Sequence, residues 1–226
     1  MHPYVIEIKS LFEKNANPSQ APAMKKYMRG QFEYLGIKTP QSKALQKEFY
    51  AVHGLPEISE LDKVVRELWM LPQREYKYVA MGLMDKFPKK LPADFIKTIE
   101  HLIVTESWWD TVDALAAHSA GMMFKRYPKI KAKYLKKWRK SKNIWLRRTT
   151  ILFQLLYKQE TDFDLLCELI RENLGSDEFF INKAIGWSLR QYGKTDPKAV
   201  KKFVKETKEL HPLSRREAMK HLKYKE

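Results

Sequence analysis

The chain has 226 residues, with 43 lysines and arginines against 27 aspartates and glutamates, which gives a formal net charge of +16 and a pI near 9.7. This charge indicates a polyanionic partner such as nucleic acid. The N-terminal segment carries Glu7 and Lys9 where a signal peptide needs an apolar core, and the longest uncharged run, 114–124, is too short to span a bilayer. The sequence therefore predicts an intracellular, cytoplasmic protein with no membrane partner.

Cysteine and histidine usage argues against a metal or redox centre. The single Cys167 lies among apolar neighbours in DLLCELI and is expected to be a core thiol. The six histidines have no spacing typical of metal ligands, and there is no CxxC motif. We therefore expect neither a metal nor a cofactor.

Apolar residues recur at i, i+3, i+4 and i+7 through almost the whole chain, which is the periodicity of amphipathic helices. Examples are the segments 61–69, 76–87 and 151–156. Proline and glycine separate such blocks, at Pro40, Pro56, Pro72, Pro88, Pro92, Pro128, Gly175, Pro197 and Pro212. This pattern predicts an all-α chain of about a dozen helices joined by short turns.

The first candidate site residues lie in the N-terminal third. Tyr27 in MKKYMRG is an aromatic residue among cations, a combination that suits contact with a nucleic-acid backbone and base. Thr39 and Pro40 in GIKTPQSK predict a helix start whose free N–H groups, together with Lys43, could hold a phosphate. Many such helix starts bind nothing, so this alternative stays open.

Several amphipathic blocks resemble one another at a step of 35 residues, a period typical of a two-helix solenoid unit. In this register Tyr78, Asp113, Arg148 and Lys183 occupy equivalent places on successive inner helices. Stacking of the repeats would line these four residues along one concave surface. The sequence therefore predicts a solenoid of antiparallel helix pairs with a basic concave face.

The stretch ESWWDTVD combines two tryptophans with two aspartates. If Ser107 is the helix N-cap, Trp109 and Asp113 lie one turn apart on the same face. A core tryptophan and a solvated carboxylate are the simpler interpretation of each residue alone. Lys183 and Trp187, however, repeat the i, i+4 relation of a charge and a tryptophan, which favours a shared functional surface.

Two adjacent arginines, Arg147 and Arg148, follow in the next repeat. Arginine binds phosphate through a bidentate fork, so either residue is a candidate phosphate contact. A solvated helix face is the alternative. The basic surroundings further predict that the pKa of Asp113 is lowered, so that this carboxylate stays ionised.

Several stretches together carry a family resemblance, among them MKKYM, EYLGIKTP, ESWWDTVD, NIWLRRTTILFQL and FFINKAIGWSLRQY. The chain resembles, essentially end to end, the AlkD-type DNA glycosylases, which are alkylpurine repair enzymes built from HEAT-like helical repeats. In that family a carboxylate, two tryptophans and an arginine line the concave cleft. The matching positions are Asp113, Trp109, Trp187 and Arg148, with Tyr27 as a further aromatic contact.

The resemblance implies one helical-repeat domain over residues 1–226 that binds and processes DNA. The implied reaction is hydrolysis of the N-glycosidic bond of cationic alkylpurines, of the 3-methyladenine and 7-methylguanine type, in duplex DNA without a base-flipping pocket. The expected enzyme is a monofunctional glycosylase, a monomer associated with the bacterial nucleoid. Expected catalytic residues are Asp113, Trp109 and Trp187, and expected DNA contacts are Arg148, Tyr27, Lys43, Thr39, Arg147, Lys183 and Arg190.

Two other interpretations remain open at this point. A non-catalytic helical-repeat adaptor would bind nucleic acid or an acidic protein through the same groove. A basic protein-interaction scaffold would need no DNA at all. The adaptor interpretation does not explain Asp113, because a carboxylate on a polyanion-binding face repels phosphate.

Overall fold

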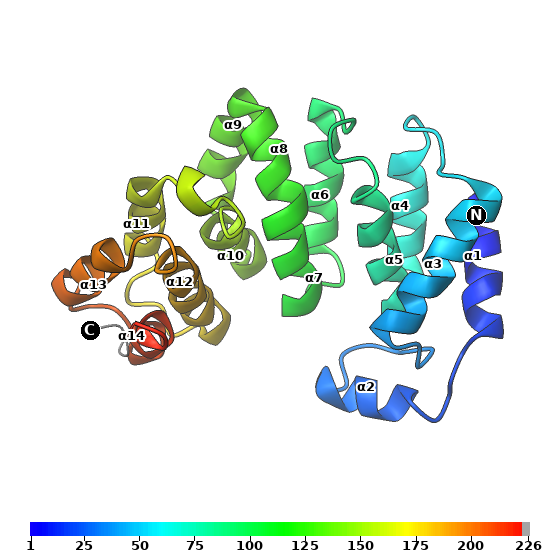
Figure 1. The fold of residues 1–226 in the computed structure, drawn as a ribbon, viewed down its shortest axis with the longest axis horizontal. Helices are drawn as coiled ribbons and strands as arrows, with labels where there is room; N and C mark the ends of the chain where they lie inside the picture. The colour runs from blue at the N-terminus through cyan, green and yellow to red at the C-terminus, as the bar shows by residue number, and fades with distance from the viewer. Residues whose placement is uncertain (223–226) are drawn as a thin grey trace. The chain divides into compact units, whose positions relative to one another are not determined.

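The computed structural model describes residues 1–222, and helices make up its regular structure (Figure 1). The α-helices are α1 (Pro3–Lys14), α2 (Ala21–Tyr27), α3 (Thr39–His53), α4 (Leu61–Met70), α5 (Arg74–Met84), α6 (Ile96–Val104), α7 (Trp109–Ala114), α8 (Gly121–Arg126), α9 (Pro128–Trp138), α10 (Ile144–Leu152), α11 (Phe163–Arg171), α12 (Phe179–Tyr192), α13 (Pro197–Glu206) and α14 (Pro212–Met219). Short 3-10 turns η1 (Ala93–Phe95) and η3 (Lys158–Glu160) and a π-helical turn η2 (Leu115–Ala120) complete the elements. The all-α prediction is confirmed.

The chain divides into two compact units, Met1–Thr98 and a second unit that begins at Ile99. The prediction of a single domain over residues 1–226 stays a prediction.

Helix starts follow the period that the sequence indicates. Helices α5, α7, α10 and α12 begin at Arg74, Trp109, Ile144 and Phe179, so successive starts lie 35 residues apart. Tyr78, Asp113, Arg148 and Lys183 are each the fifth residue of their helix. The predicted equivalence of these four positions is therefore confirmed at the level of local structure.

In unit 1, a buried carboxylate fixes the loop that leads into α3. Glu75 on α5 accepts hydrogen bonds from the backbone N–H groups of Leu35, Gly36 and Ile37, at 3.1, 2.9 and 3.1 Å. Gly36 has φ +85°, and a Cβ there would lie 1.9 Å from the carbonyl oxygen of Asn17. Only glycine fits this position, because any side chain would collide with that backbone.

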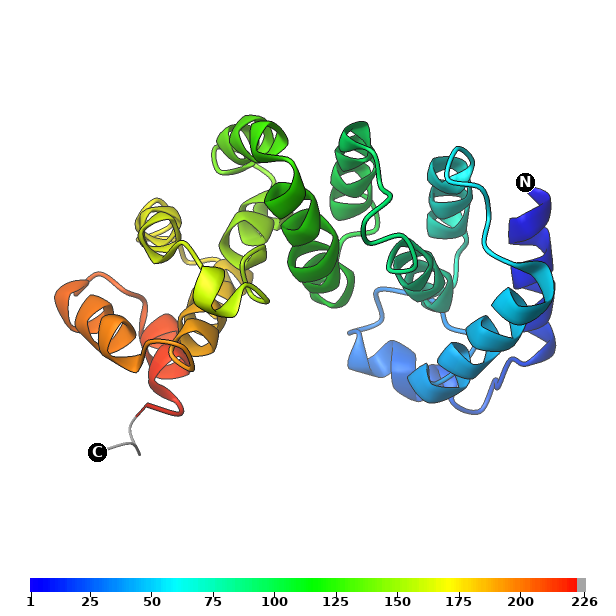
Figure 2. The same cartoon turned by 45° about the horizontal axis from the view of Figure 1, so that its top comes forward.

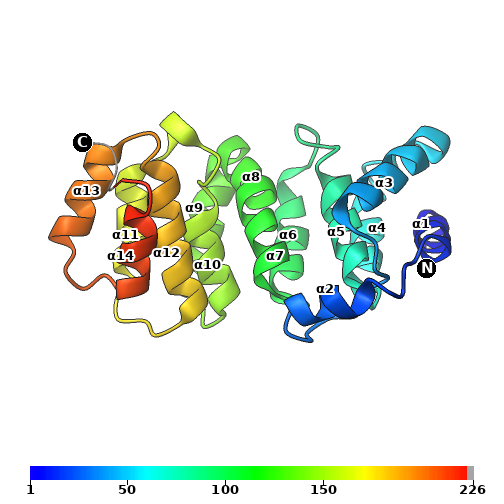
Figure 3. The ribbon, with the colours of Figure 1, turned by 60° about the horizontal axis from the view of Figure 1, so that its bottom comes forward.

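In unit 2, the inner helices α7, α10, α12 and α14 contact one another in chain order (Figure 3). Figures 1 and 2 show α9, α11 and α13 along the other side of the same unit. Ala116 of η2 and side chains of the segment from α10 to Leu222 form one buried apolar cluster. At Gly186 a Cβ would lie 2.5 Å from the Cβ of Glu217, so glycine permits the close packing of α12 on α14.

The helix that carries Asp113 continues through η2 into α8 without a break, but with a π-helical turn directly after α7. A π turn inserts an extra residue into the helix and often occurs at functional sites. Gly121, where α8 begins, packs against the backbone of the α10 C-terminus, because a Cβ there would lie 2.4 Å from the carbonyl oxygen of Phe153. Periodicity alone does not reveal this turn.

Candidate functional site

A bidentate ion pair between Asp113 and Arg148 joins two inner helices of unit 2. Arg148 Nε lies 2.7 Å from Asp113 Oδ1, and Arg148 Nη2 lies 2.8 Å from Asp113 Oδ2. The third nitrogen, Nη1, donates to the carbonyl oxygen of Phe180 on α12. The arginine side chain is only 3% exposed and the aspartate side chain 12%. One guanidinium therefore connects α7, α10 and α12 and fixes the direction of the carboxylate.

Burial decides the direction in which the pKa of Asp113 shifts. Loss of water around the carboxylate raises its pKa above the ordinary value, and the hydrogen bonds and charge of Arg148 offset this only in part. The nearby Asp110 adds a smaller upward contribution. The expectation that basic surroundings lower this pKa is wrong, because desolvation outweighs the attraction of the cation. The bidentate pair still favours the carboxylate form.

If Asp113 acts in base release, as the resemblance to the glycosylases implies, the single-turnover rate should fall on acidification at a higher pH than an ordinary aspartate would give. Protonation removes the carboxylate, and a raised pKa means that this loss begins above the usual value of about 3.9. Below the apparent pKa the rate should drop about tenfold per pH unit. A pH profile of base release from alkylated duplex measures it, with circular dichroism at each pH to confirm folding. A rate that stays flat down to about pH 4 would exclude this role for Asp113.

The helix start in ESWWDTVD differs by one residue from the prediction. Trp108 is the N-cap of α7, and its side chain makes no capping hydrogen bond. The predicted cap, Ser107, instead donates its hydroxyl hydrogen to the carbonyl oxygen of Ile103, at 2.6 Å. Ser107 fails as a cap because its hydroxyl closes the end of the preceding helix. Trp109 and Asp113 are still one turn apart on α7, and both are partly exposed.

Aromatic rings gather at the N-terminal ends of the same three helices. Trp108 lies 5.9 Å from Trp145 and 5.1 Å from Phe180, measured between ring centroids, and Trp145 lies 5.0 Å from Phe180. The Arg148 guanidinium is 5.9 Å from the Phe180 centroid. Sequence reasoning missed Trp145 and Phe180, although both are the second residue of their helix. The cluster therefore reaches the ion pair through Phe180, whose ring lies beside the Arg148 guanidinium.

A second group of charges lies where α12 packs on α14. Glu217 is 2.8 Å from Lys183 Nζ and also forms an ion pair with Arg190. Hydrogen bonds from both cations lower the pKa of Glu217, so this carboxylate stays ionised. Glu217 lies on α14, and sequence reasoning did not place a carboxylate beside Lys183. Trp187, one turn after Lys183, packs partly buried against the apolar cluster.

The other predicted DNA contacts lie in different surroundings. Arg147 Nη1 donates to the carbonyl oxygen of Ser141 at 2.8 Å. In unit 1, α3 begins at Thr39 as predicted, and Thr39 and Lys43 line a cleft of about 630 Å³ together with Tyr78. Tyr27, the last residue of α2, is 71% exposed.

Within residues 1–222 no group of three or more histidine, cysteine, aspartate or glutamate side chains is arranged to hold a metal ion. None of the helices in this described part of the chain is long and apolar enough to cross a bilayer.

Comparison with known proteins identifies the family. Residues 8–222 match the family described as DNA alkylation repair enzyme. The chain belongs to this family of DNA alkylation repair enzymes. A solved structure described as a predicted DNA alkylation repair enzyme from Enterococcus faecalis is similar, with 33% sequence identity and a TM-score of 0.84 over 93% of this chain and 98% of that chain. No curated protein matches the sequence.

Membership confirms the resemblance noted in the sequence, and it gives this repair-family chain a role in the repair of alkylated DNA. Several of the predicted catalytic and DNA-contact residues form ion pairs in unit 2: Asp113 with Arg148, and Lys183 and Arg190 with Glu217. Their individual roles remain predictions.

Proposed function

We propose that this repair-family member is a monofunctional DNA glycosylase that hydrolyses the N-glycosidic bond of cationic alkylpurines in duplex DNA. The observation that carries the proposal is the carboxylate of Asp113, oriented by Arg148 and still partly exposed beside Trp109. A carboxylate in surroundings with little water interacts strongly with positive charge. Such charge develops on the deoxyribose when the glycosidic bond breaks.

Asp113 keeps acceptor capacity after pairing with the arginine. A carboxylate has about four lone-pair sites, and Arg148 uses one on each oxygen. The remaining sites can stabilise the oxocarbenium-like sugar or accept a proton from the attacking water. The electron-rich faces of Trp109 and Trp187 would add cation–π stabilisation of the same charge.

We assign Arg148 to positioning Asp113 rather than to binding a phosphate. All three of its guanidinium nitrogens have protein acceptors, and its side chain is 3% exposed. A phosphate contact would require the arginine to leave the aspartate unpaired in a buried place, which is costly. Phosphate contacts instead suit the more exposed cations.

Those remaining DNA contacts are proposed in both units. Tyr27, Thr39 and Lys43 belong to unit 1, and Arg147, Lys183 and Arg190 belong to unit 2. Because Lys183 and Arg190 share one carboxylate, their group keeps a net positive charge that attracts phosphate. The proposal includes a monomer that acts in the bacterial cytoplasm on nucleoid DNA.

We expect release of 3-methyladenine and 7-methylguanine but little or no release of hypoxanthine or uracil. Cationic bases leave without protonation, whereas neutral bases need a general acid. Both oxygens of Asp113 accept hydrogen bonds from Arg148, and the pKa of Glu217 is lowered, so neither carboxyl group is placed to donate a proton to a leaving base. Chromatography of bases released from matched duplexes measures the selectivity, and gel analysis should show an uncut abasic strand. Efficient excision of hypoxanthine would reveal an acid outside this set.

A non-catalytic DNA-binding adaptor is the second candidate, and one observation favours it. The Asp113–Arg148 pair joins three helices and is almost buried, as a purely structural ion pair would be. Base release separates the two functions. Duplex binding without free methylated base at enzyme excess would support the adaptor.

A further inference from the structure

Helix α9 in unit 2 carries a lysine surface that the proposed reaction does not use. The chain has no aspartate or glutamate between Asp113 and Glu160, and the segment 125–142 contains ten lysines and arginines. Eight of these ten residues are exposed. A run of this kind is unusual even in a basic protein, because carboxylates and cations are normally mixed on the surface of a soluble protein.

Four of these cations form one stripe. Lys129, Lys133, Lys136 and Lys140 follow at steps of four, three and four residues, so they share one face of α9 and its C-terminal turn. The opposite face is buried and consists of Tyr134, Leu135 and Trp138. At 1.5 Å per residue the stripe is about 16 Å long.

The stripe faces away from the helices that carry Asp113. The buried face of α9 packs on α8 and α10, and Trp138 lies 5.4 Å from Phe124 between ring centroids. The lysines therefore point to the outer side of unit 2, along which α9, α11 and α13 lie (Figure 2). One straight duplex on the inner helices of unit 2 would not reach them.

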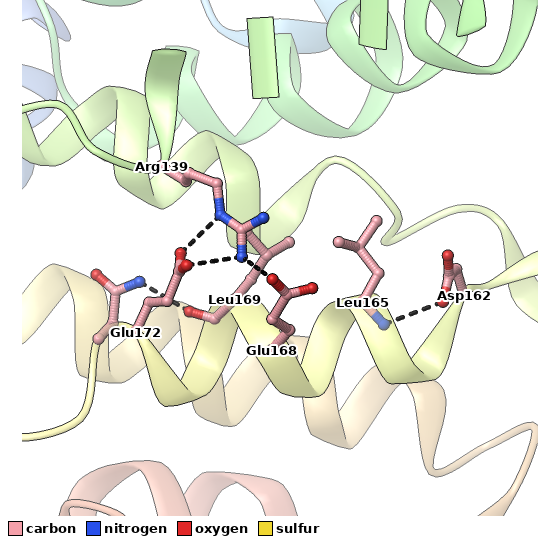
Figure 4. Close-up of polar contacts among 7 residues, drawn as sticks. Arg139, Asp162, Leu165, Glu168, Leu169 and Glu172 are labelled. Atoms are coloured by element: carbon pink, nitrogen blue, oxygen red, sulfur yellow. Dashed lines mark hydrogen bonds and ion pairs between the residues drawn. The ribbon is translucent and has the colours of Figure 1, made fainter. Parts of the chain in front are cut away.

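Nearby carboxylates neutralise the stripe only in part, because other cations already bind them. Arg139 lies 2.7 Å from both Glu168 and Glu172 on α11, and Figure 4 shows its guanidinium between the two. Lys137 pairs with Glu100 at 2.8 Å. Among residues 1–222, no ion-pair partner is present for the four stripe lysines. Because Arg139 alone offsets both Glu168 and Glu172, one negative charge remains beside Lys136 and Lys140, and the four lysines less that charge leave the stripe a net charge of +3.

We propose that the lysine stripe of α9 binds the phosphate backbone of a second segment of duplex DNA, on the side of unit 2 opposite Asp113. The proposal rests on DNA being the partner of this repair-family chain. Lysines on one helix face, about 4.5–6 Å apart along the axis, can each neutralise a phosphate of a continuous backbone. Contact with a second segment would let the protein pass between DNA segments while it searches for lesions.

Site-specific crosslinking tests the stripe directly. Ala132 is exposed on α9 beside the stripe, and the natural Cys167 is buried with a thiol pKa raised to about 12, so an introduced cysteine alone reacts at neutral pH. Ala132→Cys labelled with a photoreactive maleimide, in the presence of excess undamaged duplex, should crosslink to DNA. Ser59→Cys, exposed between Glu57 and Glu60, is the control position and should not.

Removing the stripe should strongly reduce the crosslink yield. In the Ala132→Cys chain, Lys129→Gln, Lys133→Gln, Lys136→Gln and Lys140→Gln together should reduce the yield by roughly tenfold or more at ~0.1 M salt, since each phosphate contact contributes close to tenfold there. A matched variant loses four exposed lysines of unit 1 at Lys63, Lys89, Lys90 and Lys97 and should keep the crosslink. Equal yields from the two variants, or from positions 132 and 59, would overturn the proposal.

Retention of a second duplex tests the two-segment geometry. Protein bound to an immobilised duplex should retain a fluorescent duplex, and the stripe variant should lose this retention with unchanged occupancy of the first duplex. If the stripe variant lost binding of the immobilised duplex together with retention of the fluorescent one, the stripe would contact the first duplex, and the proposal would be overturned. Crosslinking of single-stranded RNA but not of duplex DNA would overturn it as well. Failure of base release, measured separately, would refute the glycosylase and leave the stripe intact.

Discussion

Asp113→Asn should reduce the single-turnover rate of 7-methylguanine release by a factor of about 10² to 10⁴ while duplex affinity holds or rises. The substitution removes the charge that faces the developing oxocarbenium and keeps the shape of the side chain. It also removes one negative charge from a DNA-facing surface, which favours phosphate binding. Rapid-quench kinetics and fluorescence anisotropy with the same duplex measure the two quantities.

The matched control for this variant is Asp110→Asn, the same chemical change one turn earlier on α7. It should keep the wild-type rate. Thermal unfolding of both proteins must accompany the kinetics, because an amide at position 113 offers Arg148 one acceptor oxygen in place of two and should lower the unfolding free energy by about 1–3 kcal/mol. An unchanged rate in a folded Asp113→Asn protein would remove this residue from the mechanism.

Arg148→Met should cause the largest loss of stability, about 3–5 kcal/mol, because it leaves the buried Asp113 carboxylate without its cation. The pKa of Asp113 should then rise further, so the acid limb of the pH–rate profile should move to higher pH. The salt dependence of duplex binding should not change, since Arg148 touches no phosphate in this assignment. Denaturant unfolding, pH profiles and salt titrations measure the three effects.

Two further variants make this prediction specific. Asp113→Leu combined with Arg148→Met removes both charges and should recover much of the lost stability without recovering activity. Arg147→Met, at the neighbouring and more exposed arginine, should cost little stability. If Arg147 binds a phosphate, the slope of log affinity against log salt concentration should become shallower by about one phosphate contact. A shallower slope for Arg148→Met instead would show that Arg148 binds a phosphate, as the sequence first indicated.

The sequence by itself determined the elements and their register. Apolar spacing gave the helices, and a step of 35 residues gave the equivalence of Tyr78, Asp113, Arg148 and Lys183 as fifth residues of their helices. The placement of Trp109 and Asp113 one helical turn apart on the same helix was predictable as well. These features depend on the chain's own periodicity, which an α-helix converts directly into which residues share a face.

Only the tertiary structure decided what these residues contact. The pairing of Asp113 with Arg148, the second carboxylate Glu217 at Lys183, and the aromatic cluster around Phe180 each join residues from different helices. The direction of the Asp113 pKa shift was predicted wrongly for the same reason. The sequence shows how many cations surround Asp113, but the shift of its pKa depends mainly on how much water the packed helices remove from the carboxylate. Packing between distant segments of the chain sets that amount.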